Sequence, residues 1–237
     1  MRMRILLLSE GMERGGAETH VAALARGLKN AGDEVEVLSA GGREAERLAQ
    51  EGIRQICVPF CRTPVGAVKS VLAMRRAIKR GKYDVLHAHA RYPAFLLRVA
   101  ALGRRTPIAV TAHARFRHGP LLRRVCFWGD FTVAVSEDIR CDLLRFCRLP
   151  KDRVLVIPNG IDCEIFSPPQ SLKEQNAPTR ILFASRLDAD CSLGARLLCR
   201  IAPRLHRDPK VSLSHFFQQK EELSLKYLPF SDCLSSS

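Results

Sequence analysis

The regular alternation of short apolar runs with amphipathic segments most limits what this chain can fold into. Strand-like runs are expected at 3–9, 34–39, 53–58, 83–88, 107–112, 131–135 and 153–157. Helical patterns separate them, near 16–31, 43–51, 65–81, 91–103, 119–127 and 137–148. Strands that alternate with helices predict an α/β fold, in which a parallel sheet carries helices on both faces.

The loops that follow the strands are the candidate functional segments. Right-handed crossovers place all of these loops at one edge of a parallel sheet. We therefore expect the loops after residues 9, 88, 112, 135 and 157 to line a single crevice.

The first of these loops is rich in glycine. The apolar run Ile5–Leu8 leads to Gly11, Gly15 and Gly16, and the amphipathic segment follows at once. A helix that begins at such a loop presents free N–H groups and a positive dipole end to an anion such as phosphate. The spacing matches neither G-x-G-x-x-G nor a P-loop. Phosphate contact and a simple tight turn both stay open at this point.

Composition sets broad limits on the kind of protein. The 237 residues allow one large domain, or one domain and part of another, and 46% hydrophobic residues suit a globular core. No apolar run approaches the roughly 18–20 residues that span a bilayer. The N-terminal residues predict a first strand and no signal peptide, so we expect a cytoplasmic chain. The nine cysteines form no Cys-x-x-Cys pair and have no histidine pair at metal spacing, so reduced thiols and no metal are expected.

The chain is strongly basic. Lysine and arginine number 38 against 24 acidic residues, which gives a net charge of +14 and favours anionic partners. Basic residues gather at 74–82, 103–105 and 115–124. The helical stretch 65–81 suits either the surface of an anionic membrane or a solvated outer helix, and both interpretations stay open. No nucleic-acid motif accompanies the charge, so no nucleic-acid partner is expected.

A change of pattern after Phe166 predicts further domain organisation. We expect a first domain at 1–168, a proline-containing linker at 169–179, and the start of a second α/β domain at 180–210. That start is expected to be a strand at 180–184 followed by a helix from about 192 to 206. Residues 211–237 lack clear periodicity and are expected to form an aberrant or disordered tail. A second domain needs on the order of 100 further residues to close a core, so the chain looks cut short.

Several motifs occur in the order typical of one enzyme family. They are Gly15-Gly16-Ala17-Glu18-Thr19-His20, Tyr83-Asp84-Val85-Leu86-His87-Ala88-His89, Thr111-Ala112-His113, Val135-Ser136-Glu137, Ile157-Pro158-Asn159-Gly160-Ile161-Asp162 and Ser185-Arg186-Leu187-Asp188. With these motifs the chain resembles the family-4 glycosyltransferases, over the N-terminal domain and the first unit of the C-terminal domain.

The resemblance implies a GT-B architecture: two Rossmann-like domains that face each other across a cleft, the second incomplete here. It also implies a hexosyl-type transferase that moves sugar from a nucleotide-sugar donor to an acceptor hydroxyl with retention. The acceptor would be a glycan or a lipid-linked molecule, in envelope polysaccharide or glycolipid synthesis. No cofactor or metal is implied, and an anionic membrane surface at the inner face of the plasma membrane is a further candidate partner.

The resemblance also assigns roles to individual residues. His113 would be the catalytic residue that contacts the donor sugar. Gly15, Gly16 and Arg186 would bind the donor phosphates. The residues expected at the acceptor site or cleft are Glu18, His20, His89, Glu137 and Asn159.

Several of these roles stay open between a functional and a structural interpretation. His20 would face the acceptor or simply pack on the helix surface. His87 and His89 are expected to face opposite sides of their strand, with His89 nearer the cleft and His87 packed. Ser136 suits a helix cap, and Asn159-Gly160 suits a tight turn with positive φ.

The chain also departs from the family pattern. No lysine follows Arg186 within a few residues, and the glutamates after Phe166 are Glu174, Glu221 and Glu222, without the family's spacing of a glutamate pair. We therefore expect weak donor binding and little turnover by this chain. The alternative is a non-catalytic basic α/β module that docks on anionic membranes or partners.

Overall fold

A computed structural model gives the fold of this protein. It describes residues 2–13, 15–115, 126–167, 179–186, 200–201, 211–218 and 226–227. The chain divides into two compact units, Met1–Ile161 and Asp162–Ser237, and each is considered by itself.

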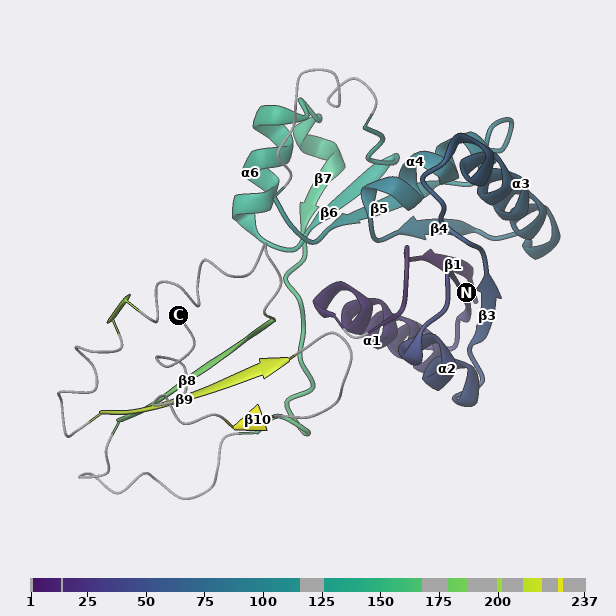
Figure 1. The fold of residues 1–237 in the computed structure, drawn as a ribbon. Helices are drawn as coiled ribbons and strands as arrows, with labels where there is room; N and C mark the ends of the chain where they lie inside the picture. The colour runs from purple at the N-terminus through teal and green to yellow at the C-terminus, as the bar shows by residue number, and fades with distance from the viewer. Residues whose placement is uncertain are drawn as a thin grey trace. The chain divides into compact units, whose positions relative to one another are not determined.

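The first unit is built on a parallel sheet in the order β3-β2-β1-β4-β5-β6-β7 (Figure 1). The strands are β1 (Arg4–Leu8), β2 (Glu34–Ser39), β3 (Arg54–Cys57), β4 (Val85–Ala88), β5 (Ile108–Ala112), β6 (Phe131–Ala134) and β7 (Val154–Val156). Each lies within a run that the sequence predicts as a strand, so this sheet confirms the α/β prediction.

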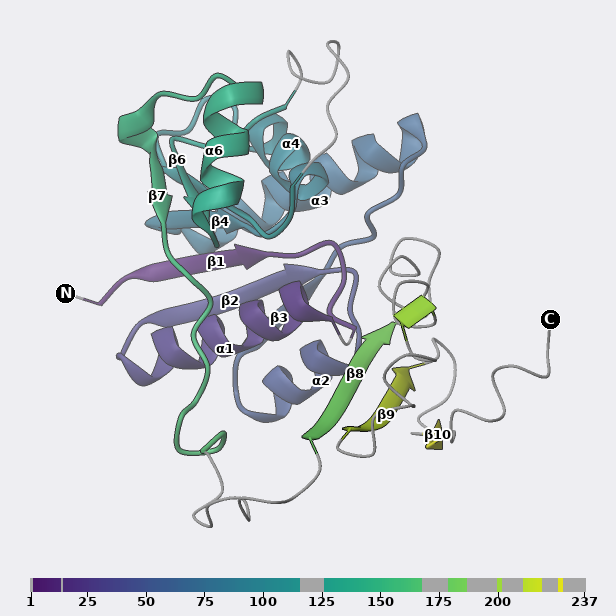
Figure 2. The same ribbon diagram turned by 90° about the vertical axis from the view of Figure 1, so that its left-hand side faces the viewer.

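Helices cover both faces of this sheet, as Figure 2 shows. They are α1 (Gly16–Asn30), α2 (Arg43–Gln50), α3 (Pro64–Gly81), α4 (Arg91–Ala100) and α6 (Glu137–Phe146), and the 3-10 turn Lys151–Arg153 precedes β7. The helix expected at 119–127 lies mainly outside the described residues. No helix in the described part of the chain has both the length and the apolar character needed to cross a bilayer.

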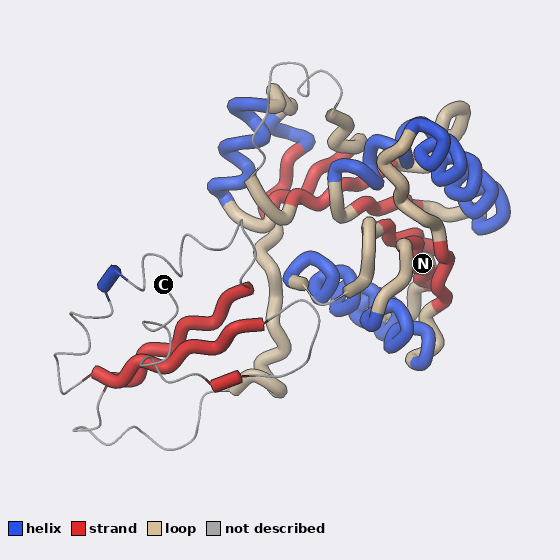
Figure 3. The backbone as a smooth tube through the Cα atoms, viewed as in Figure 1, coloured by secondary structure: helices blue, strands red, loops and turns tan. Residues whose placement is uncertain are grey.

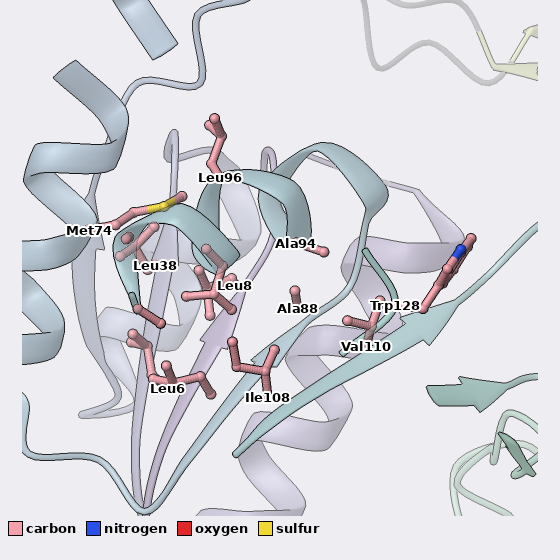
Figure 4. Packing of buried hydrophobic residues seen from close by; sticks show 14 of the residues in the cluster. Leu6, Leu8, Leu38, Met74, Ala88, Ala94, Leu96, Ile108, Val110 and Trp128 are labelled. Carbon is pink, nitrogen blue, oxygen red and sulfur yellow. The ribbon is translucent and has the colours of Figure 1, made fainter. Parts of the chain in front are cut away.

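Two apolar clusters fix the helices to the sheet, because strand side chains alternate between its faces. Leu6 and Leu8 of β1 belong to the larger cluster with Met74 of α3 and Leu96 of α4 (Figure 4). Ile5 and Leu7 of the same strand belong to the smaller cluster, with residues of α1 and α2. The core therefore sits on both sides of the sheet and leaves the strand ends for polar groups.

Local sequence signals set where two of the helices begin. Thr63 accepts a hydrogen bond from Gly66 N, and Pro64 occupies the first helical position, where it needs no N–H partner. Ser136 caps α6 by accepting from Ile139 N at 3.3 Å, which confirms the predicted cap.

The second unit contains β8 (Thr179–Arg186), β9 (Val211–Gln218) and β10 (Lys226–Tyr227) (Figure 3). Strands β8 and β9 pair in parallel, and β10 pairs with β9 antiparallel. Strand β8 confirms the strand expected at 180–184. No strand is predicted after residue 211, yet β9 lies there. Its sequence does contain a strand signal, because Val211 and Leu213 alternate with serines. The proposed linker and most of the helix expected at 192–206 lie outside the described residues.

Candidate functional site

The order of the strands reverses beside β1. Strands β1 and β4 are neighbours, although β2 and β3 lie between them in the chain. In open parallel sheets, ligands bind outside the carboxyl ends of the strands at such a switch point. The loop that leads into α1 follows β1, and His89 follows β4, so predicted site residues flank this point.

The first glycine pair opens α1. Gly15 is the residue before the helix and has extended backbone, with φ −170° and ψ 167°, and Gly16 is the first helical residue. Neither has a positive φ, so a tight turn does not require glycine here. A Cβ on Gly16 would meet nothing within 4 Å. The start of α1 is thus open at Gly16, where helical N–H groups lack partners within the helix.

The Glu18 side chain lies against Gly15 at the start of α1. Its carboxylate lies so close to Gly15 that a Cβ on Gly15 would collide with it. An acidic group is favourable at the positive end of a helix dipole. A phosphate that binds beside Gly15 therefore requires the Glu18 carboxylate to move away.

Three histidines from separate elements meet at the carboxyl ends of the strands. The ring centroid of His20, in α1, lies 4.8 Å from that of His113 and 5.5 Å from that of His89. His89 Nδ1 lies 3.4 Å from His113 Nε2. His89 is only 3% exposed, and its Nε2 has no hydrogen-bond partner among the described residues. The predicted site residues His20, His89 and His113 thus form one cluster next to the start of α1.

The prediction that His87 and His89 face opposite sides of their strand is wrong. Their ring centroids are 4.2 Å apart. Residues two positions apart along a strand point to the same side, because side chains alternate with a period of two. His87 Nε2 lies 2.8 Å from Thr111 Oγ1. His87 therefore adjoins the cluster and is held there by a polar contact.

Burial keeps these imidazoles neutral. It lowers the pKa of His87 to about 4, and the His20 and His113 rings add to the effect. Burial, with His20 nearby, likewise lowers the pKa of His113 to about 4. The pKa of His89 is well below its usual range because the ring is almost fully buried. Burial also lowers the pKa of His20, and a side-chain interaction with Asn159 partly offsets it by raising that pKa. Neutral rings can accept and donate hydrogen bonds or bind a metal ion.

The loop after β7 differs from its predicted form. Neither Asn159 nor Gly160 has a positive φ, so the predicted left-handed turn is absent there. Asn159 instead hydrogen-bonds His20 through its side chain, which ties this loop to the cluster. Glu137, at the start of α6, is exposed and pairs with Arg140 at 2.7 Å.

Arg186 belongs to the second unit. It is the last residue of β8, and its side chain is outside what the structure describes. Its predicted contact with donor phosphate therefore stays a prediction.

Sequence reasoning missed two features of this edge of the sheet. One is Thr111, the partner of His87. The other is the glycine pair Gly41-Gly42 in the loop after β2, with φ values of 91° and 131°. A Cβ on Gly42 would lie 2.5 Å from the Met12 carbonyl carbon. A Gly-Gly dipeptide directly after a strand is a recognisable turn signal and could have been used.

Comparison with known proteins settles the family. The model of "Glycosyltransferase Family 4" matches residues 14–165, most of the first unit and the majority of the chain. The chain belongs to glycosyltransferase family 4. The match includes every element that contributes to the histidine cluster, and it confirms the resemblance seen in the motifs.

Curated relatives support this assignment. The chain is 27% identical over 202 residues to a Bacillus subtilis protein named as the glycosyltransferase EpsF. The matched segment covers 78% of this chain and 52% of that protein. It is also 27% identical over 191 residues to a D-inositol 3-phosphate glycosyltransferase of Xylanimonas cellulosilytica, which covers 66% of this chain and 45% of the relative. The chain thus spans about half the length of these relatives.

Solved structures of other proteins share the fold. A glycosyltransferase from Rickettsia africae superposes with a TM-score of 0.70 at 18% identity, over 93% of this chain and 69% of that one. Anabaena Alr3699/HepE, solved in complex with UDP-glucose, gives a TM-score of 0.70 at 19% identity, over 90% of this chain and 60% of that one. At these identities the likeness establishes an α/β, Rossmann-like fold of the GT-B type.

Proposed function

We propose that this family member transfers a hexosyl group from a nucleoside-diphosphate sugar to an acceptor hydroxyl, with retention at the anomeric carbon. The observation that carries the proposal is the meeting of His20, His89 and His113 at the switch point of the sheet, beside the open start of α1. In the transfer, the bond from the anomeric carbon to the donor phosphate breaks and its electron pair leaves with the diphosphate. The acceptor hydroxyl oxygen bonds to the same carbon, and its proton passes to an oxygen of the leaving diphosphate.

In this proposal each element of the site has a separate task. His113 contacts the donor sugar near the reacting carbon and, being neutral, acts through hydrogen bonds and not through charge. Gly15, Gly16 and Arg186 bind the diphosphate, whose growing charge is the main electrostatic demand of the reaction. His20, His89, Glu18, Glu137 and Asn159 line the acceptor side. No resident cofactor or metal takes part, since the nucleotide sugar is a co-substrate.

We further propose that the 237-residue chain binds its donor weakly. The sequence after Phe166 has no glutamate pair of the family's spacing and no lysine close behind Arg186. Isothermal titration with UDP-glucose is expected to show no binding in the micromolar range. Micromolar binding together with rapid transfer would contradict this part of the proposal.

Transfer itself is tested at saturating donor. The purified chain is incubated with millimolar UDP-glucose, UDP-galactose or GDP-mannose and a bacterial lipid extract, with EDTA present, and labelled product is measured. We expect slow transfer that the variant His113→Ala abolishes. The matched control Asn30→Ala lies exposed at the far end of α1 and should retain transfer. Absence of transfer from every donor, or equal transfer by His113→Ala, would contradict the proposal, and NMR of the product tests retention.

We propose in addition that the protein works at the inner face of the plasma membrane, in envelope polysaccharide or glycolipid synthesis. The support is the outer side of α3, where Val65, Val68 and Leu72 are 48–68% exposed. Lys69 and Arg76 are exposed on the same helix. Such a mixture of apolar and basic side chains suits the surface of an anionic bilayer.

Vesicle sedimentation tests this membrane contact. Vesicles that contain phosphatidylglycerol should sediment the protein, and pure phosphatidylcholine vesicles should not. The double variant Val68→Ser/Leu72→Ser should weaken sedimentation, whereas Val99→Ser, on α4, should leave it unchanged. Equal sedimentation by both vesicle types, or by all variants, would argue against the proposed surface.

A further inference from the structure

The histidine cluster has a geometry that its proposed roles at the donor sugar and at the acceptor do not require. One ring nitrogen from each of His20, His89 and His113 lies within 4.8 Å of the other two. The three residues come from α1 and from the ends of β4 and β5, so the backbone holds each of them independently. Three converging imidazole nitrogens form the ligand set of many zinc sites.

The closest pair already has the spacing of two ligands on one ion. With Zn–N bonds of about 2.0–2.1 Å and tetrahedral angles, two nitrogens on one zinc ion lie about 3.3–3.4 Å apart. His89 Nδ1 and His113 Nε2 are 3.4 Å apart. The third nitrogen, from His20, lies within 4.8 Å of both, and His20 is only half-buried on the surface of α1. A rotation of the His20 ring is therefore the adjustment that closes the set.

The burial of His89 favours a bound ligand over a purely structural role for this ring. His89 is 3% exposed, and its Nε2 is without a hydrogen-bond partner among the described residues. The nitrogen available to an ion is therefore Nδ1, which lies 3.4 Å from His113 Nε2, and the buried, unpaired Nε2 costs stability. The rings are neutral for the reasons given above, and neutral imidazole is the form that binds a metal ion.

A purely hydrogen-bonded cluster explains less. A shared proton between His89 Nδ1 and His113 Nε2 accounts for one pair of rings. It leaves the approach of His20 to the other two rings without a role.

We propose that His20, His89 and His113 bind one divalent transition-metal ion of the zinc class. Three protein ligands leave a fourth position for water or for an oxygen of a bound molecule. The ion is not part of the transfer reaction. This inference rests on the proposed function: an ion bound to His113, at the donor sugar, and to His20 and His89, on the acceptor side, inhibits transfer.

Binding is tested without reference to activity. The full chain is titrated with Zn²⁺ in a calorimeter, and with Co²⁺ while the visible absorption of the metal is recorded. We expect one ion per chain and the strong absorption bands of tetrahedral cobalt. Each of the variants His20→Ala and His113→Ala should weaken binding by more than about tenfold.

Matched controls distinguish the loss of a metal-binding histidine from misfolding and from nonspecific metal binding by other histidines. The variant His215→Ala, in β9 of the other unit, removes one histidine outside the proposed set and should bind as the unchanged protein does. Circular dichroism and thermal melts identify any variant that fails to fold, and His20→Ala, at a half-buried helix position, is the variant expected to fold best. No saturable binding by the unchanged chain, or equal binding by His20→Ala and His215→Ala, would overturn the proposal.

The inference that the metal ion inhibits transfer is tested separately, in the transfer assay. Zinc added to the transfer assay without EDTA should abolish transfer, and EDTA should restore it. Metal binding without inhibition would overturn the inhibitory inference and leave the metal site intact. Absence of all transfer, with metal binding preserved, would count against the proposed function and not against the site.

Discussion

Two pairs of adjacent glycines lie at the carboxyl edge of the sheet, and they serve different purposes. Gly15-Gly16, after β1, has no positive φ, and Gly16 opens onto free space. Gly41-Gly42, after β2, has φ values of 91° and 131°, and a Cβ on Gly42 would collide with the backbone of Met12. The second pair is required by the fold itself. In the first pair, Gly16 leaves open space at the start of α1. A ligand can use this space, but it adds nothing to the stability of the fold.

The variant Gly42→Ala should have the largest effect. A side chain at this position meets both an unfavourable φ and the Met12 backbone, which cannot yield as a flexible side chain does. We expect a loss of about 3 kcal/mol or more in the free energy of unfolding. Urea denaturation measures it, and a loss below about 1 kcal/mol would show that the loop adapts and that the two pairs are alike.

Acid should destabilise the histidine cluster beside the first pair, because burial lowers the pKa of its members and of the adjoining His87 in β4. His87 has a folded-state pKa of about 4, against 6.5 ordinarily. Between these values the unfolded chain binds the extra proton, so the free energy of unfolding falls as the pH drops from 6.5 towards 4.

The contribution of His87 to this fall is on the order of 3 kcal/mol. Denaturant titrations at a series of pH values measure it. In the variant His87→Gln, which keeps a polar group for Thr111, stability should depend less on pH across this window. An unchanged dependence in that variant would show that other groups cause the fall.

The variant Gly15→Ala should have a moderate effect, about 1 kcal/mol, because the collision is with the movable carboxylate of Glu18. The double variant Gly15→Ala/Glu18→Ala should lose less stability than the two single changes together. Additive losses in this double-mutant cycle, measured by denaturation, would show that the contact between Gly15 and Glu18 has no energetic weight.

The variant Gly16→Ala should have the smallest effect on stability, and of opposite sign. Its φ is helical and nothing lies within 4 Å of the new methyl group, so the unfolded chain loses freedom at no cost to the folded one. We expect a gain of about 0.4–1 kcal/mol. Donor binding at millimolar UDP-glucose should weaken in the same variant. A stability loss would mean that Gly16, like Gly42, is needed by the fold.

Much of the first unit was predictable because its signals are local. Each strand of the seven-stranded sheet matches a short apolar run, and Ser136 caps its helix as predicted. The errors also have local causes. Residues two positions apart on a strand share a side, so the prediction for His87 and His89 was wrong. The Asn159-Gly160 dipeptide is a turn signal, but neither residue has a positive φ in this loop.

The candidate site was predictable as single residues but not as a cluster. His20, His89 and His113 were each named from motifs, and nothing in their spacing along the chain indicates that their rings meet. Their distances depend on β1, β4 and β5 being adjacent in the sheet. The collision between Glu18 and Gly15, and the unpaired nitrogen of His89, depend on side-chain packing that no motif records.

The sequence alone determined the α/β alternation, the family and the edge of the sheet at which to look, because periodicity and turn residues act over a few positions. Only the tertiary structure decided that three imidazoles share one buried space. Long-range strand order sets which loops become neighbours, and burial sets the charge of what they carry. That is why the possibility of a metal ion appears only once the chain is folded.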